Sequence, residues 1–214
     1  MEYTENYYGL CHGTDEKSAE IIISNGFALN GDETSWCGKG AYFYDIKAKA
    51  WWAARRKCAE IEQNKFCRIK PVILLADIEN IPKKDTFDLR VKKDLESFES
   101  FVDGMFGENE QIEIAGIDNE VERKIRLRSV LISFYAEKNN CKLVIGHFRQ
   151  RPQPLYEHAI KFADSLDMIF GIETIYCVKD TSIVSNIRLG GNLIADIIYN
   201  FVDPRIKEGE EDGQ

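Results

Sequence analysis

The stretch Gly38-Lys39-Gly40-Ala41-Tyr42-Phe43-Tyr44-Asp45 decides how this chain of 214 residues is interpreted. Two glycines flank a lysine and lead into a short aromatic run, a pattern that predicts a tight turn followed by a strand. Because glycine allows the backbone to approach another group closely, we expect the turn to lie against a ligand. The stretch therefore predicts a binding loop that opens a strand.

The segment before this stretch predicts a strand, a turn and a helix. Residues 8–12 have the character of a short strand, and Gly13 and Thr14 follow as a turn. Thr14 and Asp15 are good N-cap residues, and Gly26 is placed to end the helix before Phe27. A polar loop at residues 30–37 then connects this unit to the glycine stretch. We expect that loop to be exposed.

The remainder of the chain mixes helical and strand patterns without a regular alternation. Apolar spacing and propensity predict helices at residues 47–61, 94–106, 120–137 and 155–166, and strands at 68–78, 142–148 and 172–178. Strands beside helices without a βαβ rhythm favour an α+β fold with antiparallel pairing over a doubly wound parallel sheet.

Composition restricts the class of protein. Hydrophobic residues make up 44% and charged residues 30% of the chain, which is ordinary for a globular protein, and one domain is the default for this length. No apolar run approaches the roughly 20 residues that span a bilayer, and the N-terminus lacks the features of a secretory signal. The six cysteines are scattered without metal-ligand spacing. We expect a cytoplasmic protein with reduced thiols, no metal and no membrane association.

The net charge of −8 is concentrated at the end of the chain. Residues 208–214 carry four carboxylates, which leaves −4 for residues 1–207, and we expect this acidic tail to be disordered. Basic clusters occur at residues 123–128 and at Arg149 and Arg151, and such clusters contact phosphates in some proteins. Charge runs are more often solvated helix or loop faces. An RNA or DNA partner therefore stays open.

Together, His12-Gly13-Thr14, the helix that ends at Gly26 and Gly38–Asp45 resemble the NAD-binding half of ADP-ribosyltransferases of the poly(ADP-ribose) polymerase and diphtheria-toxin type. The resemblance covers residues 8–80 and, with less motif content, 168–190. It implies an α+β, ADP-ribosyltransferase-like fold of split antiparallel sheets with flanking helices. It also implies one catalytic domain over residues 1–207, in which a helical insertion at about 83–165 has no counterpart.

The resemblance also implies roles for particular residues. His12 would bond the adenosine ribose of NAD, Gly13 would hold the nicotinamide amide through its backbone, and Tyr42 would stack on the nicotinamide ring. Glu173 looks like the catalytic glutamate that stabilises positive charge on the nicotinamide ribose, with Glu113 and Glu157 as weaker rivals. The implied NAD-binding residues are His12, Gly13, Thr14, Gly40, Tyr42 and Trp52. Taken singly, His12 reads as a buried structural histidine and Glu173 as a solvated strand-edge residue.

Two departures from the polymerase branch bear on the product. Eight residues after Tyr42, where those polymerases have a serine that bonds the nicotinamide amide, this chain has Ala50. Eleven residues after it, where they have a second stacking tyrosine, it has Ala53. Trp51 and Trp52 are the two candidates to replace that wall, but a one-residue offset turns a helical side chain by about 100°, so the replacement is not assured. Single transfer of ADP-ribose is therefore expected, rather than chain elongation.

The expected activity is that of an NAD-dependent mono-ADP-ribosyltransferase. NAD is its substrate, nicotinamide is released, and the acceptor is a protein, RNA or DNA. A compact transferase of this kind would suit a toxin or phage-defence effector held by an antitoxin or another regulatory protein. Two alternatives stay open: an NAD glycohydrolase with water as acceptor, and a non-catalytic module that binds NAD or ADP-ribose.

Overall fold

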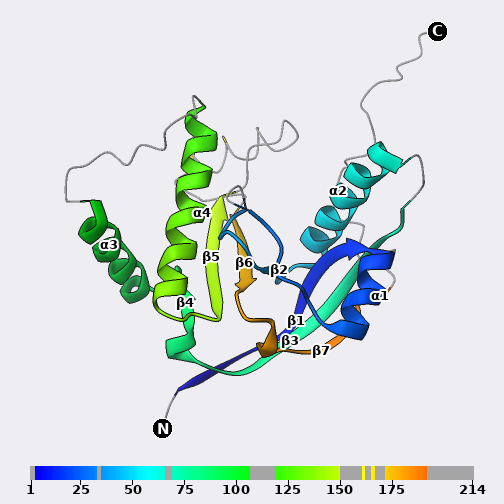
Figure 1. Cartoon of the computed structure of the whole chain (residues 1–214), viewed down its shortest axis with the longest axis horizontal. Helices are drawn as coiled ribbons and strands as arrows, with labels where there is room; N and C mark the ends of the chain where they lie inside the picture. Colours follow the sequence, from blue (N-terminus) through cyan, green and yellow to red (C-terminus); the bar gives the residue numbers. More distant parts are fainter. Residues whose placement is uncertain are drawn as a thin grey trace. The chain divides into compact units, whose positions relative to one another are not determined.

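The structure is a computed structural model that describes residues 3–32, 35–65, 69–106, 119–149, 161, 165–166 and 172–191. It is an α+β protein with seven strands and four α-helices among these residues, and both parallel and antiparallel strand pairs occur (Figure 1). The strands are β1 (Thr4–Asp15), β2 (Ala41–Tyr44), β3 (Pro71–Pro82), β4 (Thr86–Asp88), β5 (Leu143–Arg149), β6 (Ile172–Val178) and β7 (Val184–Leu189). The helices are α1 (Glu16–Asn25), α2 (Lys47–Lys65), α3 (Lys92–Phe106) and α4 (Glu120–Lys138), with 3-10 turns η1 (Lys83–Asp85) and η3 (Thr181–Ile183).

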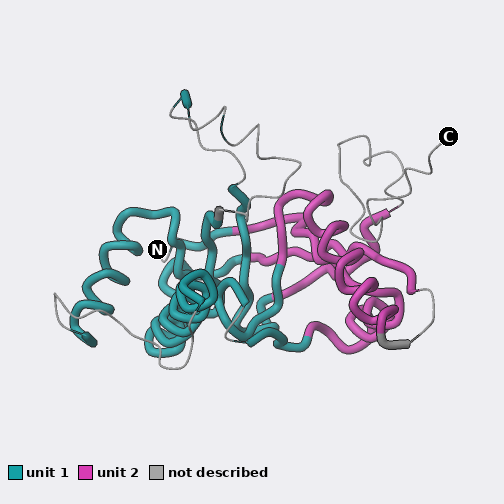
Figure 2. Tube along the Cα trace, turned by 90° about the horizontal axis from the view of Figure 1, so that it is seen from above, with its two compact units in different colours: residues 1–5, 28–42, 80–183 teal, residues 6–27, 43–79, 184–214 magenta. Residues whose placement is uncertain are grey.

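The chain divides into two compact units, each assembled from separate segments (Figure 2). The first unit contains residues 1–5, 28–42 and 80–183, and the second contains residues 6–27, 43–79 and 184–214. The boundary falls inside β2, because Tyr42 belongs to the first unit and Phe43 to the second.

The first unit is built on β4, β5 and β6. Strand β4 runs parallel to β5, whereas β5 and β6 are antiparallel over their whole length, from Leu143 opposite Val178 to Arg149 opposite Ile172. Helix α4 lies along this sheet (Figure 1), and its Tyr135 ring packs on Phe87 of β4 with centroids 4.4 Å apart. This aromatic packing fixes the helix to the sheet.

In the second unit, β3 and β7 pair antiparallel, and β1 pairs with β2 with Cys11 opposite Tyr44. Helix α1 begins at Asp15, whose carboxylate accepts from the backbone N–H of Ser18, and ends at Gly26, whose N–H donates to the Ile22 carbonyl at a φ of 81°. Both caps are those that the sequence predicts. Asp77 of β3 ties the strands together, since it accepts from the Gly9 N–H at 2.7 Å.

Several predicted elements are confirmed, with differences at their ends. The predicted strand at residues 8–12 extends over all of β1, and the helix at 47–61 continues to Lys65. Pairing is mixed rather than wholly antiparallel, because β4 is parallel to β5. Strands β4 and β7 were not anticipated from the sequence. Most of the predicted helix at 155–166, the tail at 208–214, and both Glu113 and Glu157 lie outside the described residues.

Five of the six cysteines lie in the described part of the chain. Five thiols are free and buried: Cys11, Cys37, Cys58, Cys141 and Cys177. In the described part of the chain, no helix has the length and apolar character needed to cross a bilayer.

Candidate functional site

The predicted site residues fall into both compact units. His12, Gly13, Thr14 and Trp52 belong to the second unit, whereas Gly40, Tyr42 and Glu173 belong to the first.

His12 lies near the end of β1 and is partly exposed. Its ring meets the edge of Phe27 with centroids 5.0 Å apart and planes at 79°, and it lies 5.7 Å from the ring of Phe43. Phe27 and Phe43 also contact each other at 4.9 Å. The two buried phenylalanines hold the imidazole in one orientation, while its partial exposure leaves it able to meet a ligand.

Gly13 lies directly against helix α2. A Cβ at this position would be 1.8 Å from the carbonyl oxygen of Ala50 and 2.8 Å from the backbone nitrogen of Ala54. Both alanines are fully buried, so neither the helix nor the strand can give way cheaply. Packing within the unit therefore requires glycine at position 13. This requirement does not depend on whether the Gly13 backbone also contacts a ligand.

Thr14 is fully buried in a polar network centred on Lys57 of α2. The Lys57 ammonium donates to Thr14 Oγ1 at 2.8 Å and to Ser18 Oγ at 3.1 Å, and pairs with Asp15 Oδ2 at 2.9 Å. Burial raises the pKa of Asp15, but hydrogen bonds from Ser18 and Lys57 outweigh this effect and hold it well below its usual value. The hydroxyl predicted to bind NAD thus takes part in a charged network that joins β1 to α2.

Trp52 lies on α2 and is partly exposed, with the Arg56 guanidinium 5.7 Å from its ring centroid. Its neighbour Trp51 points elsewhere and packs against the buried cluster of Cys11, Ala50 and Ile73. Consecutive helical residues face directions about 100° apart, and of the two partly buried tryptophans Trp51 packs against this cluster. The other, Trp52, stays available as an aromatic surface.

In the first unit, the glycine stretch is held tightly by its surroundings. Gly38 has a φ of 73°, which favours glycine, and a Cβ there would be 1.9 Å from Ser133 Oγ on α4. A Cβ at Gly40 would be 2.3 Å from Cys177 Sγ on β6. Both glycines are therefore explained by close approach, as the sequence predicted, although the groups that they approach are protein side chains.

Tyr42 is anchored through its hydroxyl to this same loop. The hydroxyl accepts from the backbone N–H of Cys37 at 3.0 Å and donates to the carbonyl of Gly38. Burial raises the pKa of Tyr42 far above its usual value, so the phenol remains protonated. These bonds fix the position of the hydroxyl end of the ring.

Lys179, which follows β6, completes the anchoring of the loop. Its ammonium donates to the carbonyl of Cys37, to the carbonyl of Lys39 at 2.8 Å and to Ser133 Oγ at 3.4 Å. Charge-assisted hydrogen bonds to backbone carbonyls are stronger than neutral ones. Lys179 therefore holds the chain on both sides of Gly38.

Glu173 is buried near the start of β6, with 7% of its surface exposed. It lies opposite Phe148 of β5, and cross-strand partners share one face of a sheet. Carboxylates are rarely buried in proteins because desolvation of the charge is costly. Glu173 is therefore not the solvated strand-edge residue that its position in the sequence would ordinarily indicate.

An aromatic and cationic cluster adjoins the sheet on the side of Phe148. The Arg128 guanidinium of α4 lies 4.4 Å from the ring centroid of Trp36 and 5.3 Å from that of Phe148, and it donates to the Trp36 carbonyl at 3.3 Å. Phe148 and Trp36 contact each other at 5.1 Å. Arg128 thus contacts aromatic residues of its own unit. In the sequence alone it belongs to a basic cluster of the kind that contacts phosphates.

Other residues of that basic cluster pair along the helix. Lys124 bonds Glu120 at 2.6 Å and Arg126 bonds Glu122 at 3.0 Å, both at i,i+4 spacing. Such pairs are typical of a solvated helix face. The cluster on α4 therefore gives no specific support to a nucleic-acid acceptor, and Arg151 lies outside the described residues.

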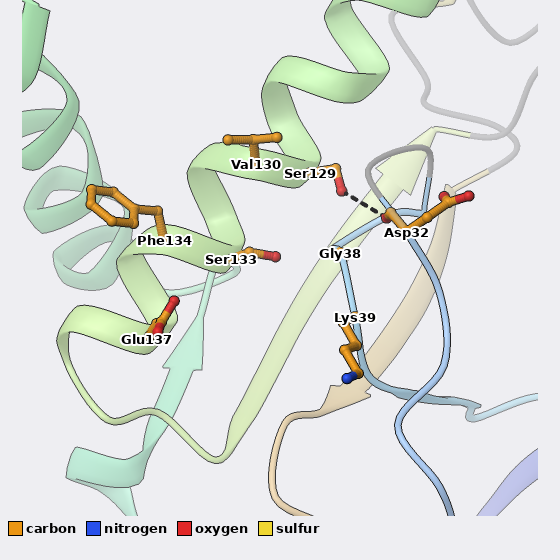
Figure 3. Close-up of a pocket in the computed structure, with 8 residues that line it drawn as sticks. All are labelled: Asp32, Gly38, Lys39, Ser129, Val130, Ser133, Phe134 and Glu137. Atoms are coloured by element: carbon orange, nitrogen blue, oxygen red, sulfur yellow. Dashed lines mark hydrogen bonds between the residues drawn. The ribbon is translucent and has the colours of Figure 1, made fainter.

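A groove of about 320 Å³ lies between α4 and the loop that carries Gly38 and Lys39 (Figure 3). Val130 and Phe134 contribute apolar side chains from α4, and Ser133 points from the helix toward Gly38. The Ser133 hydroxyl donates to the Cys37 carbonyl at 3.0 Å. The groove therefore adjoins the loop that anchors Tyr42.

Lys57 and Lys179 are the residues near the predicted site that sequence reasoning missed. Each reaches its partners over a long separation, 43 positions from Lys57 to Thr14 and 142 from Lys179 to Cys37. A lysine on a helix or after a strand carries no local signal of such a partner. Only the fold brings them to the glycine motifs.

A scan of protein-family models found no match to the chain, and neither did searches of curated proteins and of solved structures. Within the described residues, no group of three or more histidine, cysteine or acidic side chains is arranged to hold a metal ion.

Proposed function

We propose that the chain is an NAD-dependent mono-ADP-ribosyltransferase that transfers ADP-ribose to a macromolecular acceptor and releases nicotinamide. The observation that carries the proposal is the burial of Glu173 at the start of β6. Departure of nicotinamide gives the ribose oxocarbenium character, as in glycoside cleavage. A preorganised carboxylate in a water-poor site stabilises that charge more than it would in water.

Two further features support the proposal. His12 is oriented by Phe27 and Phe43 while remaining partly exposed, which suits a residue that bonds a ribose hydroxyl. The Tyr42 ring is held at its hydroxyl end by hydrogen bonds to the glycine loop, and its aromatic faces suit stacking on a flat ring. In this proposal His12 and Tyr42 bind and orient NAD, and Glu173 acts on its ribose.

The test is incubation of the wild type, Glu173→Gln and Glu99→Gln with labelled NAD and cell extract, followed by separation into protein, RNA and DNA. Glu99 is an exposed glutamate of α3 in the same unit, so its amide variant is the matched control. We expect Glu173→Gln to lower labelling and nicotinamide release by about 100-fold or more, and Glu99→Gln to retain both.

The same experiment separates the alternatives. Nicotinamide release without labelling of any fraction identifies a glycohydrolase. NAD binding without release identifies a binding module. Equal labelling by the wild type and Glu173→Gln would exclude Glu173 as the catalytic carboxylate.

A further inference from the structure

Helix α2 of the second unit has a packed inner face and an open outer face. Ala50, Ala54 and Cys58 follow one another at intervals of four residues and are fully buried. Because each residue turns the helix by about 100°, Trp52 and Arg56 lie on the opposite side. Trp52 is partly exposed, and the side chain of Arg56 is 62% exposed. The outer face therefore presents an aromatic ring and a cation to solvent.

The charge of α2 is opposite to that of the whole chain. The helix contains six lysine and arginine residues and two glutamates, a net charge of +4, whereas the chain carries −8. Helix α4 is different, because its Lys124 and Arg126 each pair with a glutamate one turn earlier. Helix α2 has too few carboxylates for such pairing, and even with Lys57 paired to Asp15 an excess of cations is left. This helix therefore attracts a polyanion although the chain as a whole is acidic.

Three cations surround the Trp52 ring at helical spacing. Lys49 precedes this tryptophan by three positions, and Arg55 and Arg56 follow it by three and four. Residues so spaced are neighbours on a helix surface, and both Lys49 and Arg55 are partly exposed. The Arg56 guanidinium lies 5.7 Å from the ring centroid, which is within the range of a cation–π contact. One turn earlier lies Ala48, whose small side chain leaves room beside the indole.

Single-stranded nucleic acid matches both properties of this face. Its phosphates are attracted by the excess positive charge, and its unpaired bases have flat faces that stack on aromatic side chains. An acidic peptide matches the charge but supplies no row of flat rings, and in a duplex the bases are already stacked on one another. We propose that the outer face of α2, which consists of Lys49, Trp52, Arg55 and Arg56, binds single-stranded nucleic acid. A base stacks on the tryptophan, and the cations contact the flanking phosphates.

The surface also indicates the class of acceptor, and this consequence rests on the proposed function. A base nitrogen of the bound strand attacks the nicotinamide ribose at C1, and the bond from C1 to nicotinamide breaks. The electron pair of that bond leaves with nicotinamide, and the proton of the base nitrogen passes to solvent. Trp52 then contacts the acceptor rather than NAD, the ligand that the resemblance implied for it.

The binding test titrates the whole chain into a labelled single strand of about 12 nucleotides, as RNA and as DNA, and follows fluorescence anisotropy at several salt concentrations. We expect Trp52→Leu to raise the Kd about 10-fold and Trp52→Phe to raise it less, since phenylalanine keeps a ring for stacking. Arg56→Gln should weaken binding and lower the salt slope by about 0.7, the value for one phosphate contact. Glu60→Gln removes the carboxylate that pairs with Arg56 and should tighten binding.

Lys92→Gln is the matched control for the charge substitutions. Lys92 lies on α3, its side chain is 88% exposed, and it pairs with a glutamate four positions later, as Arg56 does. This variant should bind the strand as the wild type does. Wild type that binds neither strand, or that binds polyglutamate or a duplex as tightly as the single strand, overturns the proposal. Because the wild type alone gives these results, misfolding of a variant does not obscure them.

Transfer is measured on the same samples with labelled NAD. We expect label on the bound strand, and less of it with Trp52→Leu at strand concentrations below the Kd. A bound strand left unlabelled by a wild type that labels protein removes the assignment of the acceptor. A wild type that binds the strand but releases no nicotinamide counts against the proposed function and leaves the binding surface standing.

Discussion

Each glycine motif is held by a lysine from a distant segment, but the two lysines meet different partners. Lys57 pairs with the carboxylate of Asp15 and donates to two hydroxyls in the second unit, whereas Lys179 in the first unit donates to two backbone carbonyls and a hydroxyl. The first network compensates a buried negative charge, and the second fixes the path of the backbone. The two glycine motifs are thus stabilised in different ways. The lysine of the second unit acts by charge compensation, and the lysine of the first unit acts by holding the backbone in one conformation.

The largest loss of stability, and the clearest difference between the two units, is expected when their glycines are replaced by alanine. In Gly13→Ala the new Cβ meets backbone atoms of α2, which cannot rotate away, so we expect a loss of about 3 kcal/mol or more in the free energy of unfolding. In Gly40→Ala the nearest atom is the Cys177 side chain, and about 1–2 kcal/mol is expected. Urea unfolding of both variants gives the comparison.

Gly104→Ala is the control for these two substitutions. Gly104 lies in α3, and a Cβ there has no neighbour within 4 Å. We expect a gain of up to about 1 kcal/mol from helix propensity. A Gly13→Ala variant as stable as the wild type would show that α2 moves freely over β1 and would contradict the packing described for the second unit.

Substitution of each lysine should show that the two networks stabilise the protein by different amounts and with different salt dependence. Lys57→Met leaves Asp15 buried without its cation and should cost about 2 kcal/mol, a value reduced by screening because Lys57 is 42% exposed. Lys179→Met removes a donor from two carbonyls and should cost about 1 kcal/mol. When urea unfolding is repeated at high salt, the loss of stability in Lys57→Met should decrease more than the loss in Lys179→Met. Equal salt dependence would remove the distinction between the networks.

The pH dependence of stability tests the electrostatic network alone. The folded pKa of Asp15 lies below its ordinary value of 3.8, so its contribution is present above about pH 4 and is lost as the pH falls toward the folded pKa. We expect the free energy of unfolding of the wild type to fall more steeply between about pH 5 and pH 2 than that of Asp15→Asn. Parallel curves would show that Asp15 is not the titrating group.

The smallest change in the free energy of unfolding is expected for a substitution on the exposed face of α2. Arg56 and Glu60 pair at 3.0 Å with side chains 62% and 61% exposed. Glu60→Gln should change the free energy of unfolding by about 0.5 kcal/mol or less, since exposed i,i+4 pairs contribute little. A loss as large as that of Lys57→Met would mean that surface charge, rather than the buried network, holds α2 in place.

Local signals explain which parts of the fold could be predicted. Helix α1 was found because Asp15 and Gly26 cap it, and β6 because its apolar run ends cleanly at Val178. Strand β4 has three residues, two of them polar. In β7 the alternation of apolar and polar residues is too weak to predict a strand. Both are strands because of partners far along the chain, and a pattern within one segment does not contain that information.

The same limit applies to the candidate site. The need for glycine at positions 38 and 40 was visible in the sequence, but the groups that approach them were not. The turn predicted at Gly13 and Thr14 is wrong, because both residues lie within β1. The burial of Glu173 comes from its pairing opposite Phe148, which a single strand cannot indicate. The roles of His12, Tyr42 and Glu173 toward NAD stay predictions, and the Glu173→Gln experiment is their first test.

The interleaving of the two units also bears on how the chain is made. The backbone passes between them five times, at residues 5/6, 27/28, 42/43, 79/80 and 183/184. Neither set of segments is complete on the ribosome until nearly all of the described residues have been synthesised, because β6 and β7 come last. Unlike a protein whose domains follow one another, this chain cannot finish one unit before starting the other. A nascent chain stalled before residue 172 should therefore resist proteolysis no better than an unfolded polypeptide.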